Sequence, residues 1–335
     1  PWAILLTGFI ISIPVCLDVA LVILAPLLYA LARDTKKSVL VFGLPLVAGM
    51  AVTHAFVPPT PGPVAVAYFL NVNLGYVIGF GILVGLPTAI ICGPFLCSKM
   101  AKLVEVPTPK DQGEDITSEE KKLPSFLQIA SLIALPIALI LAGTVVEQTA
   151  ISGIDPGLTK AERNAQVTDI LNSMPISNQV IHFLGHPVIA LMISTLLAIY
   201  FLGIGRGTSK DDLVEISTKA LGPAGIIILI TGAGGVFKGV LIATGIADAL
   251  KEVFIGSPIP FIVLAYIFAT LVRIAQGSAT VAMLTAAGLM ASFVEGFSQP
   301  YLALIACAIA AGATGFSHVN DSGFWMISRY LGMTE

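Results

Sequence analysis

The stretch THAFVPPTPGPVAVA, residues 53–67, interrupts a long apolar run with four prolines at positions 58, 59, 61 and 63. A proline inside a helix removes a backbone hydrogen bond and clashes with the preceding turn, at a cost of about 3 kcal/mol or more. In a membrane, broken backbone is tolerated only where it is buried in protein or lines a cavity. We therefore predict a discontinuous helix whose second half begins at Pro63, where the missing amide costs nothing. The free amides of residues 64–66 would point into the break, which His54, Thr60 and Gly62 would line.

The composition places this broken helix in a membrane protein. Of the 335 residues, 56% are hydrophobic and 11% are charged, whereas a soluble domain carries about 25% charged residues. Apolar stretches able to span a bilayer recur along the chain. They fall at about 1–32, 38–74, 75–98, 124–150, 179–203, 221–250, 258–296 and 299–330. The pattern predicts an all-α polytopic membrane protein, and no basic stripe suggests nucleic acid as a partner.

A second polar interruption occurs in GATGFSHVNDSGFW, residues 312–325. An intramembrane carboxylate costs at least ~2.5–3.5 kcal/mol at the bilayer centre, so such residues are functional candidates by default. Asp321 or Ser322 is a plausible N-cap for the helix that follows. A polar loop at the membrane surface is the alternative. The candidate residues are Ser317, His318, Asn320, Asp321 and Ser322.

Two apolar segments, 1–32 and 258–296, carry small or polar interruptions near their middles and are predicted to be re-entrant hairpins. Asp18 lies at the tip of the first hairpin. At the second tip, Gly277 permits the turn and Ser278 can cap the exit arm.

Three more residues near the second tip are candidates for the site. Gln276 and Thr280 offer neutral hydrogen-bonding groups for substrate hydroxyls. Arg273 is a cation that can pair with a substrate carboxylate. It can instead snorkel, or form a structural ion pair with Asp321 or Glu295.

The two hairpins and the two breaks suggest an internal repeat. Pro1 and Pro260 are 259 residues apart, and His54 and His318 are 264 apart, so two landmarks share nearly one offset. Five crossing segments separate the hairpins, and an odd number makes them open to opposite sides, as in inverted-topology transporters.

We therefore divide the chain into three parts. The first repeat, 1–98, is expected to be truncated at its N-terminus and holds the hairpin 1–32 and the broken helix 38–74. A cytoplasmic linker spans 99–123. The second repeat, 124–335, holds the hairpin 258–296 and the broken helix 299–330. With this topology one side of the membrane receives eleven Lys and Arg residues and the other three, which makes the first side cytoplasmic.

Other sequence features are weaker indications of function. The stretch TGAGGVFKGV, 231–240, fits close helix packing or another broken helix. His182 and His186 could share a helix face, but two ligands do not make a metal site. No nucleophile elbow, metalloprotease motif, P-loop or dinucleotide fingerprint is present, so we expect no enzyme, no cofactor and no ATP motor.

The motifs HAFVPPTPGPVAVA, GAGGVFKGVL, RIAQGSATVAM and FSHVNDSGFW resemble those of the bacterial gluconate permease family, gluconate:proton symporters of the ion transporter superfamily. The resemblance covers essentially the whole chain. It implies a multi-pass protein of the bacterial inner membrane that imports gluconate or a related sugar acid by proton symport. It also implies an elevator movement of a site built from two hairpin tips and two helix breaks. Similar family members handle other small carboxylates, such as D-serine or fructuronate.

We therefore expect a secondary active transporter, working as a homo-oligomer. Asp321 or His318 is the first candidate for the coupling proton and Asp18 the second. Sodium is the alternative coupling ion, and an anion channel is the alternative class.

Overall fold

The computed structural model describes residues 1–13, 17–101, 103–104, 106, 124–151, 160–219, 259–291 and 293–333, with single positions between 221 and 244. These residues form helices and connecting turns, without strands, which confirms the predicted all-α class. The predicted crossing 221–250, its glycine-rich stretch 231–240 and most of the linker 99–123 fall outside the described residues. The chain divides into two compact units.

Unit 1 comprises residues Pro1–Val72, Tyr76–Glu120 and Ile226–Glu335. It contains the segments predicted to form the two hairpins and the two breaks, and residues 14–16 at the tip of the first hairpin lie outside the described part of the chain. Its main helices are α1 (Trp2–Ile11), α2 (Leu17–Thr35), α3 (Leu40–Phe56), α4 (Pro61–Leu70), α5 (Leu74–Ile90, from Tyr76 on), α13 (Phe261–Gln276), α14 (Ala279–Met290), α15 (Gln299–Thr314) and α16 (Ser322–Tyr330). A π-helical turn, Ile91–Cys97, and the short α6, Ser98–Met100, extend α5.

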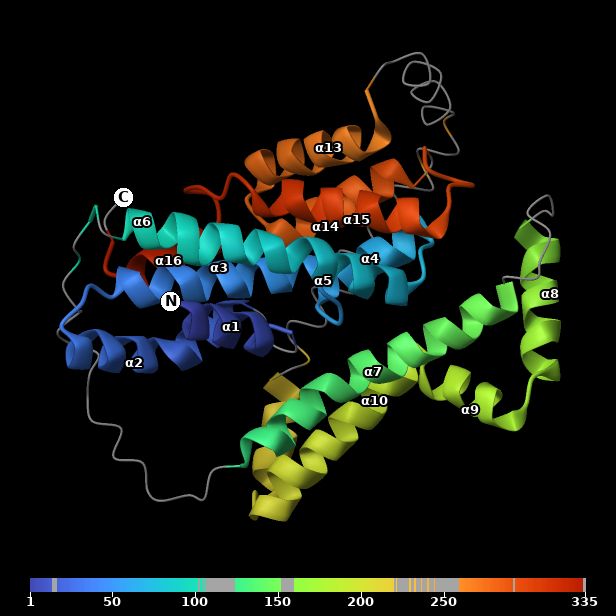
Figure 1. Cartoon of the computed structure of the whole chain (residues 1–335), viewed down its shortest axis with the longest axis horizontal. Coiled ribbons are helices and arrows are strands. Elements are labelled where there is room, and N and C mark those ends of the chain that lie inside the picture. Colours follow the sequence, from blue (N-terminus) through green and yellow to red (C-terminus); the bar gives the residue numbers. More distant parts are fainter. Residues whose placement is uncertain are drawn as a thin grey trace. The chain divides into compact units, whose positions relative to one another are not determined.

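Helix packing in unit 1 follows a repeated plan (Figure 1). Helix α1 packs on α3, and α13 packs on α15. The other arm of each hairpin contacts a half-helix from the opposite end of the sequence: α2 contacts α16, and α14 contacts α4. These contacts therefore stay the same when each helix is replaced by its counterpart in the other half, that is, α1 by α13, α2 by α14, α3 by α15 and α4 by α16.

Glycines make the corresponding close approaches possible. A Cβ on Gly49 of α3 would overlap the backbone of α1 at Leu5, and a Cβ on Gly312 of α15 would overlap the backbone of α13 at Tyr266. Gly49 and Gly312 are 263 residues apart. This spacing matches the offsets found in the sequence, so the two helix pairs use equivalent small residues.

Unit 2 comprises Asn73–Gly75 and Lys121–Gly225. Its helices are α7 (Phe126–Ile151), α8 (Lys160–Ser173), α9 (Ile176–Leu184) and α10 (Pro187–Ala198), the last continued by a π turn, Ile199–Gly203, and a 3-10 turn, Ile204–Arg206. Helices α7 and α10 lie side by side (Figure 1). A further helical stretch covers 210–219.

Four described segments are long and apolar enough to cross a membrane: Leu40–Leu70, Leu74–Cys97, Leu127–Ala150 and Pro187–Arg206. They agree with four of the five predicted crossings. The fourth begins at Pro187 rather than at 179, because Gly185 and Pro187 separate α9 from α10. Helices α1, α13 and α14 are too short to span alone.

Burial differs between these crossings. In an 18-residue apolar window of the Leu40–Leu70 crossing, 61% is buried in protein, whereas the share in the corresponding window of Leu127–Ala150 is 22%. Among the described residues, the broken crossing is therefore the more enclosed of the two.

Candidate functional site

The second hairpin tip has the predicted local structure. Helix α13 ends at Gln276, and Gly277 turns the chain with φ +80°, a value that favours glycine. The Gly277 N–H donates to the Arg273 carbonyl at 2.8 Å. Ser278 then caps α14, its hydroxyl oxygen accepting from the Val281 N–H at 3.4 Å. The prediction of a glycine turn followed by a serine cap is therefore confirmed.

The second break lies against this tip. Helix α15 ends at Thr314 and α16 begins at Ser322. Asn320 donates its side-chain amide to the Ile274 carbonyl at 2.9 Å, and the His318 ring lies 3.2 Å from the same oxygen. A Cβ on Gly277 would overlap the Asn320 backbone carbonyl. The break and the tip thus form one connected structure.

Asp321 occupies the N-cap of α16, as predicted, and its carboxylate accepts from the Gly323 N–H at 2.9 Å. The Ser317 hydroxyl and the Arg273 guanidinium donate to its other oxygen. Negative charge is favourable at a helix N-terminus. All three donors hold the Asp321 carboxylate in place at the start of α16.

Arg273 is buried, with its side chain 5% exposed, and Asp321 is 13% exposed. Arg273 also donates to the Gly277 carbonyl. Of the alternatives for this cation, the structure selects the ion pair with Asp321. Protonating Asp321 would leave a buried cation without its counter-charge, which is strongly unfavourable. These contacts weigh against Asp321 as the group that carries a transported proton.

The first break differs in detail from the prediction. Helix α3 ends at Phe56, and α4 begins at Pro61, not at Pro63. The Val64 N–H donates to the Thr60 carbonyl at 3.3 Å, so the expectation of a free amide there was wrong. Because Pro61 and Pro63 both lack an N–H, Gly62 supplies the one backbone donor of the first three helical positions.

Thr60 and Gly62 have structural partners in this break. The Thr60 hydroxyl lies 2.9 Å from the carbonyls of both His54 and Val57. Its single proton therefore serves the backbone that the prolines leave unpaired. A Cβ on Gly62 would collide with the Met283 side chain, so this glycine admits α14 against α4.

His54 and Asp18 bring the first hairpin to the same region. The Nδ1 atom of His54 is buried and has no hydrogen-bond partner in the described part of the chain. Asp18, an exposed residue in the first turn of α2, interacts electrostatically with both His54 and Asp321. The structure thus gathers residues from both tips and both breaks.

Three other candidate site residues are more accessible to solvent. Gln276 and Ser322 are exposed, and Thr280 is half-buried in the first turn of α14. Their side chains stay candidates for contact with substrate.

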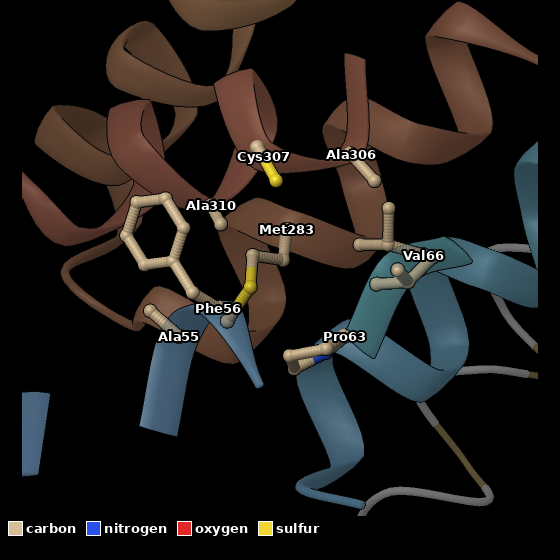
Figure 2. Close-up of a pocket in the computed structure, with 9 residues that line it drawn as sticks. Ala55, Phe56, Pro63, Val66, Met283, Ala306, Cys307 and Ala310 are labelled. Atoms are coloured by element: carbon tan, nitrogen blue, oxygen red, sulfur yellow. The ribbon is translucent and has the colours of Figure 1, made fainter. Parts of the chain in front are cut away.

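A small cavity of about 10 Å³ lies beside this region, between the first break and helices α14 and α15. Figure 2 shows the Met283 side chain among Phe56, Pro63 and Cys307. The lining is apolar apart from the thiol, and the volume suits at most one water. A sugar acid would not fit, so the cavity is not the substrate site.

The two histidines of unit 2 do not share a helix face. His182 lies in α9, whereas His186 is the N-cap of α10, after Gly185 has ended the first helix. In the described residues no group of three His, Cys, Asp or Glu side chains could hold a metal ion.

Sequence reasoning overlooked Glu147, the single charged residue of the 26-residue α7. Its presence in an otherwise apolar segment was a signal available from the sequence.

The four spans define an α-helical, multi-pass membrane protein, and its polar candidate residues lie at the hairpin tips and the helix breaks. The GntP family permease model matches residues 1–335. The chain therefore belongs to the GntP permease family, and it is a transport protein rather than an enzyme. The predicted membrane location and the resemblance are confirmed.

Curated relatives agree with this assignment. A low-affinity gluconate transporter of Escherichia coli is 37% identical over 336 residues, which cover 100% of this chain and 70% of the relative. An inner membrane permease, YgbN, of the same organism is 34% identical, covering 99% and 71%. Its L-idonate transporter of the Gnt-II system is 31% identical, covering 99% and 71%. The chain matches no solved structure with significance.

Proposed function

We propose that this permease imports gluconate, or a closely related sugar acid such as idonate, across the bacterial inner membrane by proton symport. The names of the relatives support the substrate class. Both of these substrates are hydroxylated monocarboxylates, so the site must hold one negative charge and several hydroxyl groups.

The charge balance of the site carries the proposal for proton coupling. Arg273 and Asp321 form an ion pair and so contribute no net charge. With Asp18 ionised and His54 neutral, the gathered groups sum to one negative charge. A substrate carboxylate would add a second in a partly desolvated region, where like charges repel strongly. A proton bound together with the substrate removes this penalty.

Asp18 and His54 are the groups we assign to this proton. They interact with each other, and neither has a fixed ion-pair partner among the described residues. Asp321, whose carboxylate accepts from Arg273, Ser317 and Gly323, then serves as a fixed charge that orders the second break. His318 remains a second candidate, since it lies in the same break.

The substrate would bind between the tips and the breaks. Thr280 and the N-terminal amides of α14 are suited to the carboxylate, because a helix N-terminus attracts anions. Gln276, Asn320 and Ser322 would meet hydroxyl groups, and Gly277 and Ser278 would shape the tip. The exchange-symmetric packing of unit 1 supports an inverted repeat. An elevator movement of unit 1 is part of the proposal.

The test uses the full-length protein in proteoliposomes. Labelled gluconate uptake is followed under an inward proton gradient, with and without sodium, and again after a protonophore. Uptake that requires the proton gradient and collapses with the protonophore supports the proposal. Uptake driven by sodium alone would replace the coupling ion, and transport of a different carboxylate would replace the substrate.

Two further arms locate the proton and separate carrier from channel. We expect Asp18→Asn to retain gluconate exchange while losing accumulation against a gradient. Unimpaired accumulation in this variant would remove Asp18 as the coupling group. Counterflow, in which internal unlabelled gluconate accelerates entry of labelled gluconate, is expected of a carrier and not of a channel.

A further inference from the structure

Glu147 is an acid in a membrane-spanning helix, in unit 2 and therefore outside the site proposed above. It is half-buried near the C-terminal end of α7, in a segment whose other 25 residues carry no charge. Ionisable side chains in such segments are unfavourable unless they are partnered, and they mark ion or proton pathways.

Asn73 is the first partner of Glu147 and holds the carboxylate in a defined way. The Asn73 side-chain oxygen lies 2.9 Å from the Gly75 N–H and 3.0 Å from the Thr144 hydroxyl. A backbone N–H can only donate, so it fixes which end of the amide faces it. The amide nitrogen of Asn73 then donates to Oε2 of Glu147. Because a carboxyl group can carry a proton on Oε1 and still accept on Oε2, Glu147 can change charge without losing Asn73.

His182 is the second partner. A Cβ on Gly143 of α7 would come within 2.9 Å of the Gly185 Cα at the end of α9, so the two backbones nearly touch there. Glu147 lies one turn after Gly143 on the same face of α7, and His182 lies one turn before Gly185 in α9, so the packing of these two helices places His182 near Glu147, with which it interacts electrostatically. A histidine near a carboxylate is a suitable relay, because its ring nitrogens can both bind and release a proton.

The other titratable groups around α7 are few where side chains are described. Helix α8 contributes Asp169, and His186 caps α10. The structure records an electrostatic interaction with Glu147 for His182 and for neither of these.

The place of Asn73, Glu147 and His182 in the predicted membrane topology relates them to transport. Asn73 lies in the short connection from α4, the half-helix after the first break, to α5. The predicted topology places this connection, the end of α7 and the start of α9 on the non-cytoplasmic side, from which an imported proton enters.

We propose that Glu147 is a second proton-binding site, which takes up the driving proton from the outer side through His182. In this step an N–H bond of the His182 imidazolium breaks and an O–H bond forms on Glu147, so charge and proton are conserved. The inference rests on the proposed proton symport, and it assigns that proton a place of entry distinct from Asp18 and His54.

The test compares Glu147→Gln with the wild-type protein in proteoliposomes. Glutamine keeps the side-chain length and offers an oxygen to Asn73, but it cannot bind the proton. Glu215→Gln is the matched control, since Glu215 is an exposed acid paired with Lys219 on the 210–219 helix. We expect accumulation driven by the proton gradient to fall by at least about tenfold in Glu147→Gln, as for loss of a proton-transfer group. Gluconate exchange should stay near the wild-type rate in both variants.

A second readout observes the proton directly. The infrared difference spectrum of the purified protein between two pH values should contain a carboxylic acid C=O band that is absent in Glu147→Gln and present in Glu215→Gln. An unchanged band, full accumulation, or equal loss of exchange and accumulation in Glu147→Gln would each overturn the inference. Wild-type uptake that ignores the proton gradient would instead defeat the proposed symport itself, and so the two failures can be told apart.

Discussion

The ion pair between Arg273 and Asp321 gives the sharpest quantitative prediction. Both side chains are largely buried, at 5% and 13% exposure. Removing one partner of a buried pair leaves an uncompensated charge and costs about 3–5 kcal/mol, whereas removing both charges costs much less. Asp321→Asn should therefore destabilise the protein more than the double variant with Arg273→Met.

The same geometry ranks the single variants. In Asp321→Asn the buried Arg273 guanidinium keeps the Gly277 carbonyl and a neutral amide oxygen as acceptors, but it loses its counter-charge. In Arg273→Met, Asp321 keeps donors from Ser317 and Gly323 and is closer to solvent. We therefore expect Asp321→Asn to be the least stable of the three.

Thermal unfolding of the purified full-length protein measures this order. At ~2–4 °C per kcal/mol, a loss of 3–5 kcal/mol lowers the midpoint by roughly 6–20 °C. Glu295→Gln is the control, because Glu295 is an exposed acid close in sequence to the second tip. If Asp321→Asn melts at the wild-type temperature, or if the double variant is the least stable, the charge-compensation argument is refuted.

Three further predictions use matched glycines and one hydroxyl. Gly49→Ala should lower the unfolding temperature, because the new Cβ would overlap the α1 backbone. The control Gly79→Ala has no neighbour within 4 Å and should leave the unfolding temperature unchanged. Equal unfolding temperatures for the two variants would contradict the close packing of α1 on α3. Gly277→Ala should abolish gluconate uptake, because the new Cβ would sit at φ +80° and would also clash with the backbone of Asn320. The control Gly207→Ala has nearly the same backbone angle, φ +79°, but lies in open space. It should lower the free energy of unfolding by only about 1 kcal/mol and retain uptake. Thr60→Val should lose about 1–3 kcal/mol by leaving the His54 and Val57 carbonyls unpaired, and Thr60→Ser should restore most of the unfolding temperature; no difference between Val and Ser would exclude the bridging role.

The sequence predicted the parts of the site that depend on local chemistry. Gly277, Ser278 and Asp321 have the turn and capping roles expected of their residue types. The partner of Arg273 could not be chosen from sequence, because Asp321 and Glu295 were both plausible and the choice depends on tertiary packing. The start of α4 was misplaced by two residues because Pro61 and Pro63 both suit a first helical turn.

The partners of Glu147 could not be predicted from the sequence for a different reason. A lone acid in an apolar helix was visible in the sequence, but its partners Asn73 and His182 are 74 and 35 residues away from it. Contacts at such separation come from helix packing through Gly143 and Gly185, which no local pattern records.

The exchange of half-helices between the hairpins has a consequence for biosynthesis. Helix α4 buries Ala65, Val66 and Phe69 and packs on α14, which the ribosome completes more than 200 residues later. Long-range contacts of this kind cannot form until the later partner exists. The newly made first hairpin and broken helix must therefore wait in the membrane with an incomplete interface, and we expect the membrane-insertion and quality-control machinery to protect this half until the second hairpin is inserted.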